Sequence, residues 1–422
     1  MVFCPSITRG QKIEEPQKQI LENGLTIITQ KDDSSGITIL ELLVKGGKRS
    51  ERPGQDGLSY LATRLALEFP DRAAVQEVME KSARTMMTSR GDYSFIHLEC
   101  LSEHLDPILK ILSGILKEPL FSPIRVGRIT GFMSDQAKIE SDDNMNVGHL
   151  ALLRRFLKGR GYSGSIFGEE SSLIKLKSRE IEAYFKTYFT PGNMILASVS
   201  DLDPARLIAI LKKYFGDLKP QKISPPWARP RADEAAGFEP PEKIIEKDTA
   251  QTLISSGFAL PPLTEKNYAL AVLAESLLGR GPGSRLWPLR AEKKLAYNVN
   301  VRVTVMRDGG LFETYLETDP VKTAKARDAL TATLGEVRAH GVTQDELQVA
   351  KTFTRADFLR GNEPKANRTA TLGSFEALGL GFEYFSRFLE ELNGVTLDEI
   401  NIYLQTILDP ANEATVIVGR KT

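Results

Sequence analysis

Two patterns of apolar residues follow one another along the chain. Short runs rich in β-branched and aromatic residues predict β-strands. These runs cover residues 25–31, 37–45, 85–89, 93–101, 194–200, 252–260, 310–318 and 414–419. Longer segments with apolar residues at helical spacing predict amphipathic helices. These segments include residues 104–117, 124–140, 145–157, 178–189, 204–214 and 269–278. The mixture predicts an α+β fold.

Proline marks a break between two parts of the chain. Six prolines fall between Lys219 and Pro241, among charged residues and few large aliphatic ones. Such a composition predicts an extended linker, 219–241, between an N-terminal domain (1–218) and a C-terminal domain (242–422). A chain of 422 residues is also too long for one hydrophobic core. The alternative, a long surface loop within one domain, is disfavoured by its length.

The two parts share a local sequence pattern. In each part an amphipathic helix meets a proline, then an asparagine two residues later, then a β run, and the offset is constant (399 − 180 = 219). The matching residues are Glu180, Ile181, Tyr184, Thr187, Pro191 and Asn193 with Glu399, Ile400, Tyr403, Thr406, Pro410 and Asn412. Shared position and chemistry predict two homologous halves, each a mostly antiparallel β-sheet covered by helices.

Charge and composition exclude several classes of function. The formal net charge is zero, so no global field attracts nucleic acid or an anionic membrane surface. No apolar run reaches the ~20 residues that span a bilayer. The only cysteines, Cys4 and Cys100, cannot by themselves build a disulfide framework or a zinc site. The N-terminal residues contain no signal peptide and predict a cytoplasmic protein, or a periplasmic one if an export signal has been removed.

One segment places an arginine and a tyrosine where a helix gives way to a strand. In residues 285–297 (RLWPLRAEKKLAY) apolar residues keep helical spacing up to Lys293, and a period-two alternation begins at Leu295. Arg290 and Tyr297 flank that change, so a guanidinium and a phenol can converge on one oxygen. The alternative is a surface arginine and a tyrosine packed at a helix–strand corner.

The chain resembles the pitrilysin/insulinase family of zinc metallopeptidases along nearly its whole length. The similar segments are NGLTIITQ, LLVKGGKRSERPGQDGLSYL and FTPGNMILASVSDLD in the first half and SRLWPLRAEKKLAYNV in the second. The resemblance implies the fold shared by the LuxS-type and processing-peptidase metallopeptidases. In that fold two homologous halves close a chamber around an unfolded peptide, either with another subunit or with more chain. It is nearest to the small bacterial two-chain members.

The metal motif of that family is missing here. The family carries the inverted zinc signature H-x-x-E-H of the inverzincins on a helix. The resemblance places Tyr60 and Arg64 at its two histidines, Thr63 at its glutamate, and Asp135 or Gln136 at its third ligand. Arg64 cannot lose its proton to bind a cation, and threonine has no basicity to activate water. We therefore expect no metal ligand set and no cofactor in this chain.

The second half keeps another feature of the family. An arginine and a tyrosine seven positions apart contact the substrate carbonyl there, and Arg290 and Tyr297 match them (297 − 290 = 7). The resemblance thus implies a non-catalytic subunit of a heterodimeric zinc endopeptidase. A homologous zinc-bearing partner would hold the metal, and the substrate would be an unfolded peptide.

The same resemblance implies that two further segments bind the substrate. The glycine-rich turn with Gly281 and Gly283 would border the chamber, and Ser284 after it is predicted to cap the next helix. Residues Thr85, Met86 and Met87 match the strand that pairs with the peptide in active members. A strand in the interior of the sheet is the favoured alternative for that segment.

Two other functions compete with the subunit. One is a peptide-binding or assembly scaffold without peptidase activity, like the respiratory core subunits of the family, against which Arg290 and Tyr297 argue modestly. The other is an enzyme with a different nucleophile, for which no Ser-His or Cys-His arrangement is recognisable.

Overall fold

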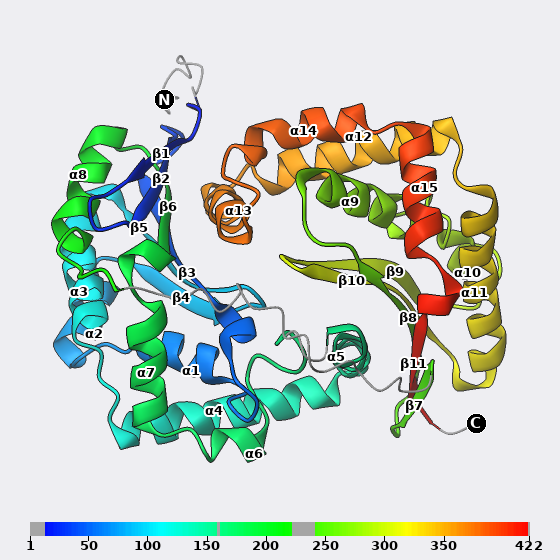
Figure 1. Ribbon diagram of the computed structural model, residues 1–422, viewed down its shortest axis with the longest axis horizontal. Helices are drawn as coiled ribbons and strands as arrows, with labels where there is room; N and C mark the ends of the chain where they lie inside the picture. The colour runs from blue at the N-terminus through cyan, green and yellow to red at the C-terminus, as the bar shows by residue number, and fades with distance from the viewer. Residues whose placement is uncertain (1–12, 158–160, 222–240, 421–422) are drawn as a thin grey trace, which may run out of the picture.

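The computed structural model describes residues 13–157, 161–221 and 241–420. They form a two-domain α+β fold of two sheets with helices packed on them, as Figure 1 shows, which confirms the predicted fold class. Most of the predicted linker, residues 222–240, lies outside the described residues, so the predicted domain boundaries stay a prediction. Among the described helices, none combines the length and the apolar composition that crossing a bilayer requires.

The N-terminal half contains a six-stranded sheet in the order β1-β2-β6-β3-β5-β4. Its strands are β1 (Gln17–Ile20), β2 (Thr26–Lys31), β3 (Ile37–Lys45), β4 (Arg84–Ser89), β5 (Tyr93–Leu101) and β6 (Met194–Ser200). Its helices are α1 (Leu58–Leu65), α2 (Arg72–Glu80), α3 (Leu105–Lys117), α4 (Pro123–Asp142), α5 (Asn144–Leu157), α6 (Glu170–Leu173), α7 (Ser178–Tyr188) and α8 (Pro204–Phe215).

The C-terminal half contains a five-stranded sheet in the order β7-β11-β8-β10-β9. Its strands are β7 (Glu242–Glu246), β8 (Thr252–Leu260), β9 (Asn298–Met306), β10 (Gly309–Thr318) and β11 (Ala414–Gly419). Its helices are α9 (Glu265–Gly279), α10 (Trp287–Ala291), α11 (Thr323–His340), α12 (Gln344–Gly361), α13 (Lys365–Leu378), α14 (Tyr384–Gly394) and α15 (Leu397–Ile407).

The two sheets have the same topology. Strands β2 to β6 take the order β2-β6-β3-β5-β4, and β7 to β11 take the matching order, with one parallel pair in each (β2 with β6, β7 with β11). The repeated sequence folds alike as well. Helix α7, a 3₁₀ turn at Pro191–Asn193 and β6 correspond to α15, a turn at Pro410–Asn412 and β11. The local repeat therefore reflects a repeat of the whole topology.

Each sheet packs against helices of its own half on one face and against a helix of the other half on the opposite face. Helix α13 lies on the N-terminal sheet, where Leu372 and Ala377 join the core of Leu43 and Ile195. Helix α5 lies on the C-terminal sheet, where Leu152 and other apolar residues pack on β8, β10 and β11. Figure 1 shows both helices between the two sheets. The halves are thus interlocked through their cores.

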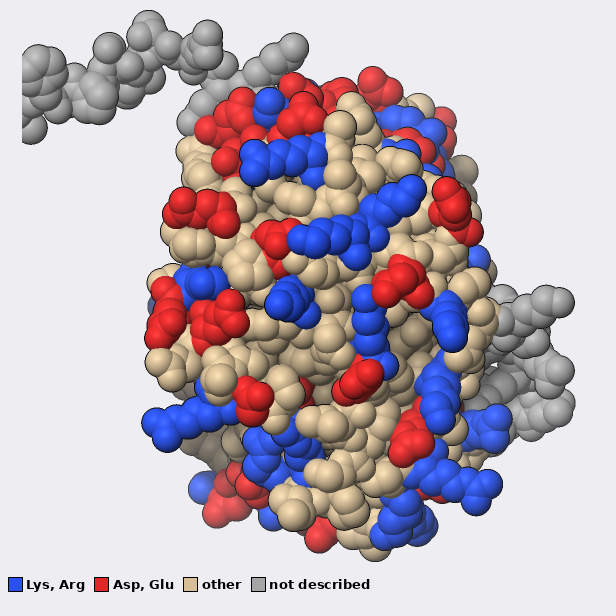
Figure 2. Space-filling model, turned by 90° about the vertical axis from the view of Figure 1, so that its left-hand side faces the viewer, with Lys and Arg blue, Asp and Glu red and all other residues tan. Residues whose placement is uncertain are grey.

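The outer face of the N-terminal half carries mixed charge. Figure 2 shows basic and acidic side chains interspersed over this face, with no large area of a single sign. Several of these charges pair across neighbouring helices, for example Lys213 with Asp106 at 2.8 Å and Lys117 with Asp217 at 2.8 Å. Interspersed charges of both signs keep a surface soluble without attracting one kind of polyion.

Candidate site across the two halves

A buried carboxylate organises the start of helix α1, where the family's metal motif would stand. Gly57, the residue before α1, has a φ of 90°, and a Cβ there would meet the carbonyl oxygen of Phe167 at 2.9 Å. The Glu51 carboxylate accepts hydrogen bonds from the Gly57 N–H (3.1 Å), the Ser59 N–H (2.8 Å) and the Ser59 hydroxyl (2.7 Å). An anion at a helix N-terminus satisfies amide groups that have no partner within the helix.

The three residues of α1 that are predicted at the motif positions pack, hydrogen-bond or form an ion pair within the protein. The buried Tyr60 ring packs edge-on against Phe167, with centroids 4.9 Å apart, and burial raises the pKa of its phenol while nearby Arg64 opposes the shift. The Thr63 hydroxyl donates to the Ser59 carbonyl at 2.7 Å. The Arg64 guanidinium lies 2.5 Å from the Glu68 carboxylate.

These residues do not fit a catalytic dication. A fixed guanidinium, a protonated phenol and a threonine committed to the helix backbone supply no imidazole or carboxylate ligand. At the predicted third-ligand position on α4, the exposed Asp135 carboxylate lies 3.7 Å from the Lys138 ammonium, and the half-buried Gln136 could offer an amide oxygen only. Within the described residues, no group of three or more His, Cys, Asp or Glu side chains could hold a metal ion. That this chain binds no zinc stays a prediction, which metal analysis of the purified protein tests.

Strand β4 lies at the edge of its sheet. In the described part of the chain it pairs with β5 only, from Arg84 opposite Glu99 to Ser89 opposite Ser94. The favoured alternative, a strand in the sheet interior, is therefore wrong. Met86 is 54% exposed, and Thr85 and Met87 are half-buried. One backbone edge of β4 is thus positioned to accept a further strand.

Arg290 and Tyr297 both reach solvent. Arg290 is exposed on α10, and its guanidinium lies over the Trp287 ring at 5.1 Å from the centroid. Tyr297 directly precedes β9; its side chain is 56% exposed, and its N–H donates to the Glu317 carbonyl at 2.8 Å. A contact with the face of an aromatic ring uses none of the guanidinium N–H donors in a conventional hydrogen bond.

The segment around this pair differs from the prediction in its bounds. Helix α10 ends at Ala291, before Lys293, and β9 starts at Asn298, after Leu295. Beyond the end of the helix, Lys294 takes a positive φ of 53°, so the right-handed helix does not resume there. Leu295 instead turns into the core, 4% exposed, with its N–H bonded to the Leu289 carbonyl.

The glycine-rich turn before α10 is closed by its own hydrogen bonds. Gly281 has a φ of 78°, and the Ser284 hydroxyl donates to the Gly281 carbonyl at 2.8 Å. The expectation that Ser284 caps the next helix is therefore wrong, since Leu286 takes the N-cap position. Gly283 faces open space apart from Val349 of α12, 4.0 Å from where its Cβ would be. The predicted substrate-binding role of Gly281 and Gly283 stays a prediction.

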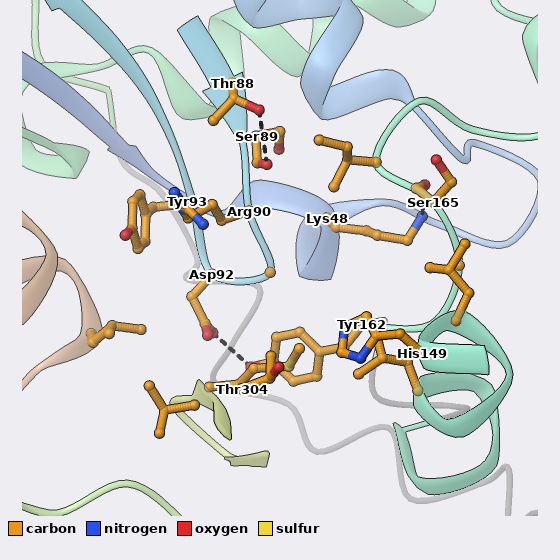
Figure 3. Close-up of a pocket in the computed structure, with 18 of the residues that line it drawn as sticks. Lys48, Thr88, Ser89, Arg90, Asp92, Tyr93, His149, Tyr162, Ser165 and Thr304 are labelled. Atoms are coloured by element: carbon orange, nitrogen blue, oxygen red, sulfur yellow. Dashed lines mark hydrogen bonds between the residues drawn. The ribbon is translucent and has the colours of Figure 1, made fainter. Parts of the chain in front are cut away.

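A cavity of about 590 Å³ lies between the two halves, lined by the β4–β5 hairpin, α5, β9 and α13, as Figure 3 shows. Tyr162 donates to the Asp92 carboxylate at 2.6 Å, and Asp92 also accepts the Arg307 N–H at 3.0 Å. His149 on α5 lies 2.7 Å from the Glu313 carboxylate of β10. These groups come from distant segments, so spacing in the sequence could not have indicated them.

Comparisons with known proteins agree with this architecture. Residues 26–168 match the family model "Insulinase (Peptidase family M16)", and residues 175–353 match "Peptidase M16 inactive domain". An uncharacterized zinc protease of Bacillus subtilis is 22% identical over 392 residues, which cover 90% of this chain and 92% of that protein. A non-peptidase homolog of Helicobacter pylori is 24% identical over 413 residues, covering 96% and 94%.

A solved structure has the same fold. The crystal structure of a peptidase M16 inactive domain from Pseudomonas fluorescens superposes with a TM-score of 0.84 at 20% identity, covering 97% of this chain and 98% of that chain. Two models of one family thus match most of both halves. The chain is a peptidase-like member of the M16 (insulinase) family, with an M16 inactive domain over residues 175–353.

Proposed function

We propose that this chain is the non-catalytic, substrate-binding subunit of a heterodimeric zinc endopeptidase that acts on unfolded peptides. A homologous subunit would hold the zinc ion, and Arg290 and Tyr297 would complete its active site. The proposal rests on one contrast. The motif positions of α1 are committed to packing, a backbone hydrogen bond and an ion pair, whereas Arg290 and Tyr297 project into solvent.

The chemistry of the pair suits an oxygen that becomes negatively charged. When a peptide carbonyl is attacked, charge develops on its oxygen, and donors placed in advance stabilise the transition state. The Arg290 guanidinium brings a permanent charge and several donors, and the Tyr297 hydroxyl brings one more. The Trp287 ring under Arg290 limits the positions that its side chain explores, which reduces the entropy lost on binding.

The open edge of β4 supports a role in holding the peptide. An extended peptide can add to a sheet edge through main-chain hydrogen bonds, which tolerate many sequences. The exposed Met86 side chain beside that edge offers an adaptable apolar contact, with Thr85 and Met87 next to it. Such binding requires an unfolded segment, since a folded substrate has already paired its backbone.

The test is reconstitution with a zinc-bearing homologue that carries H-x-x-E-H. Arg290→Ala and Tyr297→Phe should each lower the kcat of the complex on an unstructured peptide, by about 10²–10³-fold if the pair stabilises the transition state. Arg206→Ala is the matched control, because Arg206 is an exposed arginine on α8 of the other half. Unchanged turnover with both variants, or stoichiometric zinc on the isolated chain, would contradict the proposal.

A second function is favoured by one relative. The Helicobacter pylori protein is named a non-peptidase homolog, which fits a peptide-binding or assembly scaffold without a peptidase partner. A scaffold would bind unfolded peptide through the β4 edge and would be indifferent to Arg290→Ala and Tyr297→Phe. Peptide binding that survives both substitutions, together with no hydrolysis in the presence of any zinc-bearing homologue, would favour the scaffold.

A further inference from the structure

Three arginines surround one carboxylate at the end of helix α1. Arg64 of α1 lies 2.5 Å from Glu68, and Arg128 of α4 pairs with the other oxygen of the same carboxylate. Arg125 of α4 lies 4.0 Å from Glu68 and donates to the carbonyls of Phe69 and Pro70, each at 3.0 Å. Arg125 thereby joins α4 to the segment after α1. The ion pairs that Arg64 and Arg128 form within the described residues are both with Glu68.

The cluster carries an excess of positive charge. One carboxylate faces three guanidiniums, so the four groups sum to a charge of about +2 at neutral pH. The Glu68 side chain is 9% exposed, but those of Arg64 and Arg128 are 33% and 61% exposed. A guanidinium has five N–H donors, so both arginines retain donors after they bond Glu68. The guanidiniums therefore offer a partly solvated anion site.

One of the two arginines is carried by the helix that packs on the strand assigned above to the peptide. Helix α1, which carries Arg64, packs against β4, and the hydroxyls of Ser59 and Ser89 lie 2.8 Å apart between them. A peptide that adds to β4 would pass close to α1. The substituted metal motif therefore leaves a region of positive charge, now made by guanidiniums that bind anions and cannot hydrolyse a peptide bond.

We propose that Arg64 and Arg128 bind a carboxylate of the peptide, so that this chain selects acidic unfolded peptides. The peptide as ligand rests on the proposed function; the anion site rests on the cluster itself. A carboxylate matches the fork of a guanidinium, which forms two parallel N–H···O bonds with it. An aspartate or glutamate side chain and the C-terminal carboxylate share this chemistry.

Binding of fluorescent unstructured peptides to the purified full-length chain tests the proposal. Four peptides of one length would be compared by fluorescence anisotropy, with glutamates or glutamines and with a free or an amidated C-terminus. The acidic amidated peptide should bind about tenfold more tightly than its neutral amidated counterpart. The neutral peptide with a free C-terminus measures the other source of the carboxylate. Added salt should reduce the difference, since both arginines are solvated.

Two variants change the cluster in opposite directions. The double variant Arg64→Gln/Arg128→Gln should lose the preference for carboxylates and keep the affinity for the neutral amidated peptide. Glu68→Gln removes the carboxylate that occupies the guanidiniums, so it should strengthen binding of the acidic peptide severalfold. A purely structural cluster would show no such gain. Arg206→Gln, an exposed arginine on α8, is the control and should change nothing.

The proposal fails if all four peptides bind alike, or if neither cluster variant changes the preference. Circular dichroism of each variant verifies folding, and Glu68→Gln, which removes a buried charge without removing an arginine, keeps the test valid if the double variant unfolds. The subunit hypothesis fails separately, through unchanged turnover of the complex with Arg290→Ala and Tyr297→Phe. A chain that prefers acidic peptides without supporting hydrolysis would be a selective scaffold.

Discussion

The two halves of this protein share a topology and differ in the side chains they present. Strands β2 to β6 and β7 to β11 take the same order in their sheets, and α7 to β6 corresponds to α15 to β11. The N-terminal half buries Tyr60 and Thr63, the residues that the sequence analysis predicts at the metal-motif positions, while the C-terminal half exposes Arg290 and Tyr297. The comparison teaches that one topology can present different side chains, because strand order is set by the pairing and packing of whole sheets and helices rather than by single residues.

The largest effect should come from restoring a charge to the N-terminal site. Thr63 is fully buried, and Thr63→Glu would place a carboxylate there without ligands, which should cost about 3 kcal/mol in the free energy of unfolding. Thr63→Val is the control; it loses only the hydrogen bond to Ser59 and should cost about 1 kcal/mol. Urea denaturation measures both. A Thr63→Glu variant as stable as wild type would show that the pocket still accommodates an anion.

The next comparison concerns α13 and α5, the two helices that each pack on the sheet of the other half. A Cβ at Gly373 of α13 would meet Leu43 at 2.5 Å and Ala197 at 3.3 Å, while at Gly148 of α5 it would meet one leucine side chain, Leu253, at 2.7 Å. Gly373→Ile should therefore destabilise the protein by about 2 kcal/mol, and Gly148→Ile by less. Thermal unfolding gives the ranking. Gly335→Ile on α11 is the control for the added side chain, because Gly335 faces open space. A larger loss of stability for Gly148→Ile than for Gly373→Ile would contradict the tighter packing of α13.

A smaller effect should appear in the pH dependence of stability at Asp92, which lies between β4 and β5 and accepts the N–H of Arg307 between β9 and β10. Burial raises the pKa of Asp92 above 3.8, although the bonds from Tyr162 and the Arg307 N–H oppose this shift. A carboxyl with a raised folded pKa contributes stability that is present below its unfolded pKa and is lost as pH rises through the folded pKa. Relative to Asp92→Asn, the urea midpoint of the wild type should thus fall from about pH 4 upward. Parallel curves for the two proteins would contradict the prediction.

The smallest effect should distinguish the two equivalent helices α7 and α15. The Thr396 hydroxyl accepts the Glu399 N–H at 3.2 Å and caps α15, while Lys177 takes the N-cap position of α7. Thr396→Ala should destabilise the protein by about 1 kcal/mol. Lys177→Thr should stabilise it by about 0.5 kcal/mol. Glu180 already accepts the N–H of residue 177, and the new hydroxyl would supply the second bond of a capping box. Chemical denaturation measures both changes, and effects of equal sign would contradict the comparison.

Much of the fold could be predicted because its signals are local. The strands at 37–45 and 93–101 have the predicted bounds, and α7 differs from its predicted bounds by one residue. Alternation and helical spacing express which faces are buried, and that is the property that decides these elements. The constant offset of 219 residues correctly indicated a repeated structure.

The errors arose where distant contacts decide the structure. Strand β4 lies at an edge because β5 is its partner and the rest of the sheet extends in the other direction, which no feature of residues 84–89 encodes. Helix α10 stops early because Leu295 is drawn into the core beside Leu289. The arginine cluster at Glu68 joins residues 60 positions apart, so spacing could not indicate it.

The sequence by itself indicated the repeated α+β topology, predicted a substituted metal motif at Tyr60, Thr63 and Arg64, and determined the spacing of Arg290 and Tyr297. Only the tertiary structure decided that helices α5 and α13 each pack on the sheet of the other half, that β4 has a free edge, and that arginines of α1 and α4 share one carboxylate. The physical reason is range: propensity and periodicity act over one helix turn or strand, whereas strand order and charge clusters depend on which distant surfaces pack together.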